Sequence, residues 1–134
     1  MGKIKFITAL GEIIAELKRD SPKTVEILLN FLPMKYNVPL WVWGEEVFFF
    51  LPDSLKEKID FENAKTDLQI WDVAYWVRDP AICLFFGKTP LSRGKNPVAA
   101  EPINVIGRII QGKEILPKLT KGDLIIMLKA SESE

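Results

Sequence analysis

The chain has 134 residues, of which 48% are hydrophobic and 27% charged, a composition typical of one globular domain spanning residues 1–134. Its 18 Lys and Arg balance its 18 Asp and Glu, so no excess charge favours nucleic acid or a membrane surface as a partner. The chain contains no histidine and a single cysteine, Cys83, which excludes Ser-His-Asp and Cys-His relays and the usual zinc and copper sites. We expect neither a metal nor a cofactor.

The opening segment lacks the uninterrupted apolar core of a signal peptide, because Lys5, Glu12 and Glu16 break it. No charge-free apolar stretch is long enough to cross a bilayer. One cysteine cannot form an internal disulfide, which agrees with a reducing compartment. These features predict a cytoplasmic protein without a membrane partner.

The N-terminal third of the chain begins with a hairpin and continues into a helix. Residues 3–8 alternate between apolar and polar, and residues 12–18 carry β-branched and apolar side chains beyond a Leu10-Gly11 turn. Ser21-Pro22 then supplies an N-cap and a proline for the first helical position. Apolar residues recur at helical spacing after it, which predicts a helix over 22–32.

The rest of the chain is rich in short apolar runs with aromatic and β-branched residues. Strands are predicted at 39–43 and 45–51, joined at Gly44, and a short helix and a loop are equally compatible with 54–66. The later apolar runs, separated by Pro, Gly and Ser, predict strands at 68–77, 82–86, 103–110 and 123–130, a long loop at 87–102, a short helix at 113–120 and a frayed SESE tail. Many strands around few helices indicate a mainly β fold, a closed or nearly closed antiparallel barrel.

The segment ICLFFGKTPLS at 82–92 contains Gly-Lys-Thr, the ending of a phosphate-binding P-loop. A P-loop requires a glycine five residues before Gly87 and a helix directly after the Lys-Thr pair. Ile82 stands at the first of these places, and Pro90 follows the threonine. A strand end with a turn is therefore strongly preferred over nucleotide binding.

Several blocks of the sequence resemble the cyclophilin-like family. DSPKTVE at 20–26 is similar to the first-helix segment of cyclophilins, and VIGRIIQG at 105–112 is similar to the strand and turn that lead into their second helix. A small prokaryotic group of uncharacterised cyclophilin-like proteins matches more closely, through WGEEVFF (43–49), DVAYWV (72–77), ICLFFGKTPLS (82–92) and NVIGRI (104–109). The resemblance implies a cyclophilin-like β-barrel from Lys3 to Lys129.

The resemblance does not extend to the catalytic residues of peptidyl-prolyl isomerases. Active cyclophilins carry an Arg within a Phe-His-Arg stretch, which polarises the prolyl amide, and a Gln-Gly-Gly pattern that helps to hold the peptide. The corresponding stretch, WVWGEEVFFFL at 41–51, has two glutamates and no Arg, His or Gln. The family pattern therefore implies a hydrophobic groove without the isomerase chemistry, and no catalytic residue is assigned.

Candidate ligand-binding residues are aromatic side chains, one carboxyl and two flanking cations. Glu46 begins a same-face series with Phe48, whereas Glu45 should lie on a solvated edge, because adjacent strand residues point to opposite faces. Trp and Tyr form apolar walls with a polar handle, although most aromatics in a small barrel pack in its core. Arg78 and Lys88 flank the central strands, where a cation could meet a ligand carboxylate or carbonyl. The predicted set is Trp43, Glu46, Tyr75, Trp76, Arg78, Phe85, Phe86 and Lys88. Which of the two phenylalanines faces the groove stays open.

Three functional hypotheses follow from these residues. The preferred one is binding of a peptide segment or small ligand in an aromatic-lined groove without catalysis. The second is an unorthodox peptidyl-prolyl isomerase, in which pocket shape and Arg78 replace the missing catalytic Arg; isomerisation needs no covalent chemistry, so the lack of histidine does not exclude it. The third is an oligomerisation module that uses exposed aromatics as the interface of a homo-oligomer.

Overall fold

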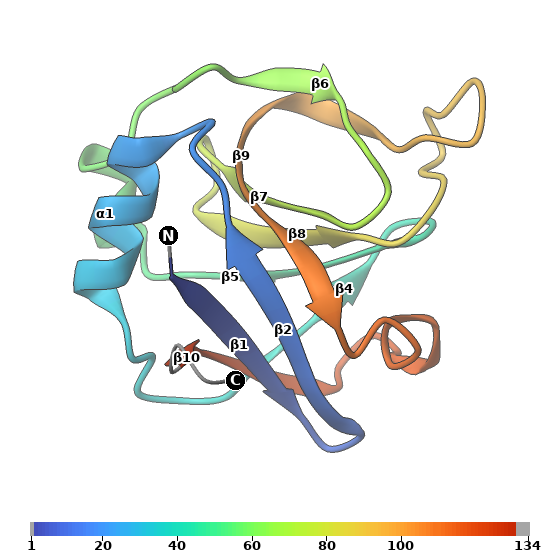
Figure 1. Cartoon of the computed structure of the whole chain (residues 1–134), viewed down its shortest axis with the longest axis horizontal. Coiled ribbons are helices and arrows are strands. Elements are labelled where there is room, and N and C mark those ends of the chain that lie inside the picture. The colour runs from blue at the N-terminus through green and yellow to red at the C-terminus, as the bar shows by residue number, and fades with distance from the viewer. Residues whose placement is uncertain (1, 131–134) are drawn as a thin grey trace.

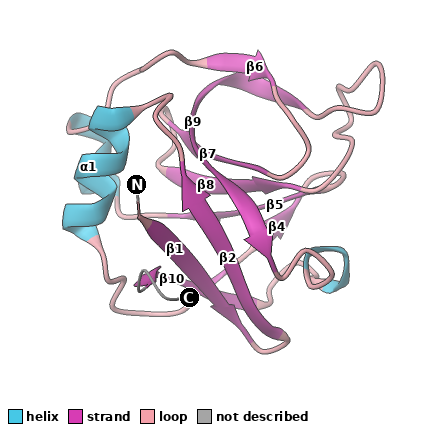
Figure 2. Ribbon diagram, viewed as in Figure 1, coloured by secondary structure: helices cyan, strands magenta, loops and turns pink. Residues whose placement is uncertain are grey.

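The computed structural model describes residues 2–130, so the predicted frayed tail lies outside the described residues. One α-helix, α1 (Pro22–Phe31), stands against a curled antiparallel sheet (Figures 1 and 2). The strands are β1 (Lys3–Thr8), β2 (Gly11–Leu17), β3 (Val38–Pro39), β4 (Trp41–Val42), β5 (Glu46–Phe50), β6 (Lys65–Asp67), β7 (Asp72–Trp76), β8 (Ala81–Phe85), β9 (Val98–Gln111) and β10 (Leu124–Ala130). Two 3-10 helices, η1 (Asp53–Glu57) and η2 (Leu116–Lys118), lie between strands. Within residues 2–130, no helix is both long enough and apolar enough to span a membrane.

The sheet is not closed into a barrel, contrary to the prediction. Its strands run in the order β3-β10-β1-β2-β9-β7-β8-β5-β4, with β6 added on the first part of β9, and every described pairing is antiparallel. The edge strands β3 and β4 are successive parts of one extended stretch, with only Leu40 between them. Because these segments follow each other along the chain, they cannot pair side by side. The predicted closure is therefore not confirmed, while the mainly β antiparallel architecture is.

Local sequence signals placed the N-terminal elements correctly. The β1–β2 hairpin turns at Ala9-Leu10, one residue before the predicted Leu10-Gly11, because Gly11 already pairs with Thr8. Helix α1 ends one residue before the predicted limit. The 54–66 segment overlaps both η1 and the short strand β6. The predicted helix at 113–120 is reduced to the three residues of η2.

Two predicted boundaries around the later strands need correction. The segment 87–102 is not one long loop, because β9 begins at Val98 and pairs there with β6, with Asp67 opposite Val98. The predicted strand at 68–77 is limited to β7, because a turn precedes it: the Asp72 carboxylate accepts the Gln69 N–H at 2.8 Å. Both boundaries depend on contacts that local composition does not contain.

Alternation along the strands divides the buried side chains between two faces of the sheet. On β8, Ile82 and Leu84 belong to the main core, which the apolar side of α1 completes through Val25 and Leu28. The opposite face, which we call the outer face, carries a second, smaller cluster. Its buried members are Leu68, Ala74, Cys83, Phe85, Ala99, Ile103 and Val105. The first part of β9 contributes to this cluster on the side of the sheet away from α1.

The N-terminus of α1 is held by the loop after η1 rather than by its own N-cap residue. Ser21, predicted to cap the helix, makes no side-chain cap hydrogen bond. Instead the Glu62 carboxylate accepts two backbone N–H groups of the first turn, at 3.0 and 2.9 Å. The fully buried Asn104 amide orients this loop: it donates to Thr24 Oγ1 (3.0 Å) and the Asp60 carbonyl (2.9 Å) and accepts the Glu62 N–H (2.9 Å). Asn104 thus joins β9 to the helix.

Candidate ligand-binding pocket

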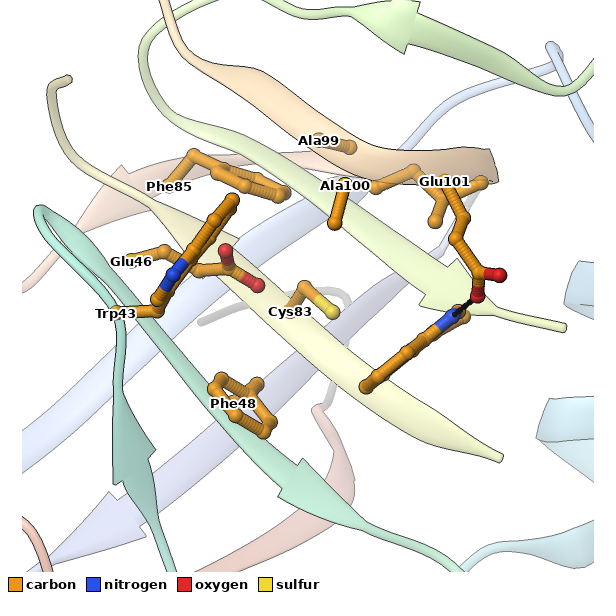
Figure 3. Close-up of a pocket in the computed structure, with 10 residues that line it drawn as sticks. Trp43, Glu46, Phe48, Cys83, Phe85, Ala99, Ala100 and Glu101 are labelled. Carbon is orange, nitrogen blue, oxygen red and sulfur yellow. Dashed lines mark hydrogen bonds between the residues drawn. The ribbon is translucent and has the colours of Figure 1, made fainter. Parts of the chain in front are cut away.

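A cavity of about 290 Å³ opens on the outer face, beside the second cluster (Figure 3). Strands β5, β7, β8 and β9 and the turn before β5 supply its walls, which are mostly aromatic and aliphatic. Its lining consists of Trp43, Glu46, Phe48, Trp76, Cys83, Phe85, Ala99, Ala100, Glu101 and Ile103. We call it the outer-face cavity.

Trp43 reaches the cavity because a tight turn separates it from β5. The Trp43 N–H donates to the Glu46 carbonyl at 2.9 Å, and the Glu46 N–H donates back to the Trp43 carbonyl at 3.2 Å. Gly44 allows this turn, since its φ is +61° and a Cβ there would lie 2.9 Å from the Lys88 carbonyl oxygen. The indole and the Glu46 carboxyl therefore face the same cavity (Figure 3).

Glu46 is the buried carboxyl of the cavity. Its side chain points into the space between Trp43 and Cys83 (Figure 3), and the residue is only 6% exposed. Burial raises the pKa of this carboxyl from 4.5 to about 7, although a hydrogen bond with the Cys83 side chain acts in the opposite direction. A carboxyl in this position changes its charge near neutral pH.

Cys83 packs beside Glu46 as an apolar, protonated thiol. Burial raises the pKa of the thiol well above its ordinary value, and the Glu46 charge and hydrogen bond raise it further. Because the thiolate is the reactive form of cysteine, this environment suppresses nucleophilic chemistry. Cys83 therefore contributes an apolar wall and a hydrogen-bond partner for Glu46.

The rim of the cavity carries a second carboxylate with two partners. The Trp76 indole Nε1–H donates to Glu101 Oε1 at 2.6 Å, and Arg78 Nη1 lies 3.6 Å from Glu101 Oε2. The Phe48 and Trp76 rings meet edge to face, with centroids 6.2 Å apart. These contacts fix the Trp76 ring as one wall of the cavity.

The structure brings half of the predicted site residues together in the lining: Trp43, Glu46, Trp76 and Phe85. Arg78 is close to them only through Glu101, and its side chain is 70% exposed. Tyr75 and Phe86 do not line the cavity, since Tyr75 belongs to the main core and Phe86 packs against it. Of the two phenylalanines, Phe85 lines the cavity and Phe86 does not, because alternation turns Phe86 to the other side.

Lys88 lies in the turn after β8, outside the lining. The Glu45 carboxylate accepts the Lys88 backbone N–H at 3.0 Å, and the Glu45 N–H donates to the Lys88 carbonyl at 2.7 Å. The Thr89 hydroxyl donates to the Val98 carbonyl at 2.6 Å. The Gly-Lys-Thr segment is thus a strand end tied to its neighbours, as the missing P-loop glycine predicted.

Sequence reasoning missed six lining residues: Phe48, Cys83, Ala99, Ala100, Glu101 and Ile103. A signal existed for two of them, because period-two alternation places Phe48 with Glu46 and Cys83 with Phe85. The other four belong to β9, in or next to a Pro-containing segment predicted to be mostly a loop. Among residues 2–130, no group of three or more Cys, Asp or Glu side chains is placed to hold a metal ion.

The buried Tyr75 hydroxyl should lower the stability of the folded protein. The hydroxyl is buried without a hydrogen-bond partner among the described residues, and burial raises its pKa to about 12. Since an unsatisfied buried hydroxyl is destabilising, Tyr75→Phe should raise the free energy of unfolding by about 1 kcal/mol. Urea denaturation measures this, with the exposed Tyr36→Phe as the matched control. A loss of stability in Tyr75→Phe would contradict the assignment.

The curled antiparallel sheet, the single α-helix and the outer-face cavity define a class of small β proteins with a side pocket. A family model described as Cyclophilin-like matches residues 2–128, and the chain therefore belongs to the cyclophilin-like family. This confirms the resemblance found in the sequence. No match was found among curated proteins.

Two solved structures resemble the chain over nearly its whole length. The solution structure of the hypothetical protein AF2241 from Archaeoglobus fulgidus has 32% sequence identity and a TM-score of 0.79, covering 96% of this chain and 95% of that one. The structure of McbB in complex with tryptophan has 14% identity and a TM-score of 0.68. It covers 96% of this chain but 45% of the McbB chain, and at this identity the likeness concerns the fold alone.

Proposed function

We propose that the protein binds a small ligand, or one side chain of a peptide segment, in the outer-face cavity without catalysing a reaction. The observation that carries this proposal is a set of aromatic walls around a buried carboxyl in a cavity of about 290 Å³. Ligand sites in proteins are concave and mostly apolar, with few polar groups that fix the orientation of the ligand. The cavity has this composition at a volume suited to a small molecule.

The chemistry of the lining supports binding rather than covalent catalysis. The Cys83 thiol is held in its protonated form, and the chain has no histidine to activate a hydroxyl nucleophile. The four rings of Trp43, Phe48, Trp76 and Phe85 offer flat apolar surface. A ligand with a planar apolar body and one polar group that reaches Glu46 fits this arrangement.

The test is a titration of the protein with aromatic fragments and short proline peptides, followed by tryptophan fluorescence and calorimetry. Because McbB has been determined with tryptophan bound, tryptophan is included as one probe. The variant is Ala100→Phe, which places a ring at an exposed position of the lining, and the control is Ala9→Phe, in the exposed β1–β2 turn. We expect Ala100→Phe to weaken binding at least about tenfold, a loss of about 1.4 kcal/mol, and Ala9→Phe to leave it unchanged. Failure of every probe to bind would overturn the proposal, as would equal affinity in both variants.

The isomerase hypothesis depends on Arg78 acting on a prolyl amide. In the structure the Arg78 guanidinium contacts Glu101 at the rim and is not part of the lining. A protease-free isomerisation assay compares wild type with Arg78→Ala on several proline peptides. Acceleration by wild type that is lost in the variant would contradict the non-catalytic proposal.

The oligomerisation hypothesis draws on exposed aromatics near the sheet edge. Trp41 and Phe50 are both exposed, with ring centroids 6.5 Å apart, and Tyr36 is exposed in the preceding loop. Such a patch is typical of interaction surfaces. Sedimentation at low concentration decides this alternative, because a persistent monomer would remove it.

A further inference from the structure

We propose that the outer-face cavity selects ligands that carry a protonated amine, with the Glu46 carboxylate as the anchor and the surrounding rings as the cage for the ammonium group. This inference rests on the proposed function and specifies the chemical class of its ligand. It follows from an unpaired buried carboxyl, from the kind of polar atoms in the lining, and from the charges around the mouth.

Glu46 has no cationic partner among the described residues. The ion pairs within residues 2–130 do not include it, and its side chain hydrogen-bonds with the Cys83 thiol. A buried carboxylate without a counter-charge is strongly destabilised. An ammonium ligand would supply both the missing positive charge and N–H donors for the carboxylate oxygens.

The polar atoms of the lining are mainly acceptors. Glu46 and Glu101 contribute carboxylate oxygens, whereas the Trp76 indole N–H is already donated to Glu101 and the Cys83 thiol is engaged with Glu46. The Trp43 indole N–H is the remaining side-chain donor. A ligand carboxylate would thus meet two like charges and one donor, whereas an ammonium group would meet acceptors.

The walls and the rim of the cavity also favour a positively charged ligand. The faces of Trp and Phe rings attract cations, most strongly where water is excluded. The Arg78 guanidinium, which contacts the rim, pairs with Glu101 rather than with Glu46. Glu101 therefore neutralises the Arg78 charge at the rim, and the Glu46 carboxylate inside the cavity has no counter-charge among the described residues.

The experiment uses three probes with the same ring and different polar groups: phenethylammonium, 2-phenylethanol and 3-phenylpropanoate. Calorimetry at pH 8 measures the affinity of each for the wild-type protein. We expect phenethylammonium to bind at least about tenfold more tightly than the alcohol and the carboxylate to bind most weakly. Equal affinity for amine and alcohol would overturn this inference while leaving the proposed function intact; no binding of any probe, tryptophan included, would overturn both.

Two variants test whether the preference for the amine over the alcohol depends on Glu46. Glu46→Gln keeps the shape of the anchor and removes its charge, so the amine-to-alcohol affinity ratio should fall to near one. Glu45→Gln removes the same charge at the adjacent, exposed position outside the lining, and its ratio should match that of wild type. A ratio that falls equally in both variants would show a general charge effect and contradict the assignment to Glu46.

The pH dependence gives a second, independent readout. The titratable group in contact with the Glu46 carboxyl is the Cys83 thiol from β8; Glu101 from β9 also lines the cavity, but its carboxylate is turned to Trp76 and Arg78. Because an ammonium binds the ionised carboxylate, and burial raises the pKa of Glu46 to about 7, affinity for phenethylammonium should decrease by roughly ten- to a hundredfold from pH 8 to pH 5. An affinity that rises on acidification would mean that the protonated carboxyl donates to a neutral acceptor, and would overturn the proposal.

Discussion

When the pH is raised from 4 to 8, the free energy of unfolding of the wild-type protein should decrease by about 3 kcal/mol more than that of the Glu46→Gln variant. The cause is the burial that raises the pKa of Glu46 from 4.5 to about 7. In this window the folded state binds more protons than the unfolded state, so stability falls as pH rises. The stabilisation that the protonated Glu46 carboxyl gives the folded state is complete below pH 4.5 and absent above about pH 7. Because glutamine does not titrate, the Glu46→Gln variant should lack this decrease in stability.

The measurement is urea denaturation of both proteins at pH 4 and pH 8. Other shifted groups, such as Asp72, whose burial raises its pKa, and Glu62, are present in both proteins and cancel in the difference. Glu45→Gln is the control, because it removes a charge from an exposed neighbour, and its pH dependence should follow that of wild type. Parallel curves for wild type and Glu46→Gln would show that Glu46 is solvated, and would contradict the buried anchor.

Replacing Asn104 with alanine is expected to lower the free energy of unfolding by about 3 kcal/mol, because it breaks a buried hydrogen-bond network. The substitution removes the hydrogen bonds to Thr24 Oγ1, the Asp60 carbonyl and the Glu62 N–H. The loss leaves buried polar groups unpaired and releases the loop that caps α1.

Denaturation at pH 7 measures the Asn104 effect, and amide hydrogen exchange shows where it acts. Exchange should accelerate in the first turn of α1, whose N–H groups bond to Glu62. Asn30→Ala makes the same chemical change on the exposed side of the helix and should alter stability by less than about 0.5 kcal/mol. A similar small effect from Asn104→Ala would refute the role of the network.

The parts of the fold that the sequence predicted are those that local chemistry determines. The turn of the β1–β2 hairpin and the Pro22 helix start lie within a few residues of the elements they define. The cap of α1 could not be predicted in the same way, since Glu62 acts from about forty residues along the chain. Closure of the barrel is not confirmed, and strand content alone could not decide it, since it does not reveal that β3 and β4 lie end to end.

The candidate site was half predictable for the same reason. Alternation selected Glu46, and the family resemblance pointed to Phe85 and Phe86 without choosing between them. Tyr75 was included although it alternates with Trp76, and the structure places it in the main core. Glu101 was missed because its strand depends on pairing with β6, a partner distant in sequence.

The central claim, that the outer-face cavity is a ligand site, is tested most directly by the four tryptophan indole N–H signals in NMR spectra during titration with phenethylammonium. Trp43 and Trp76 line the cavity. Trp41 and Trp71 lie elsewhere. Lys121 Nζ is 4.7 Å from the centroid of the Trp41 ring, and Lys113 Nζ is 4.9 Å from the centroid of the Trp71 ring. We expect the Trp43 and Trp76 signals to shift with one saturation curve while the other two stay in place. Unchanged signals for Trp43 and Trp76, or shifts confined to Trp41 and Trp71, would contradict the claim.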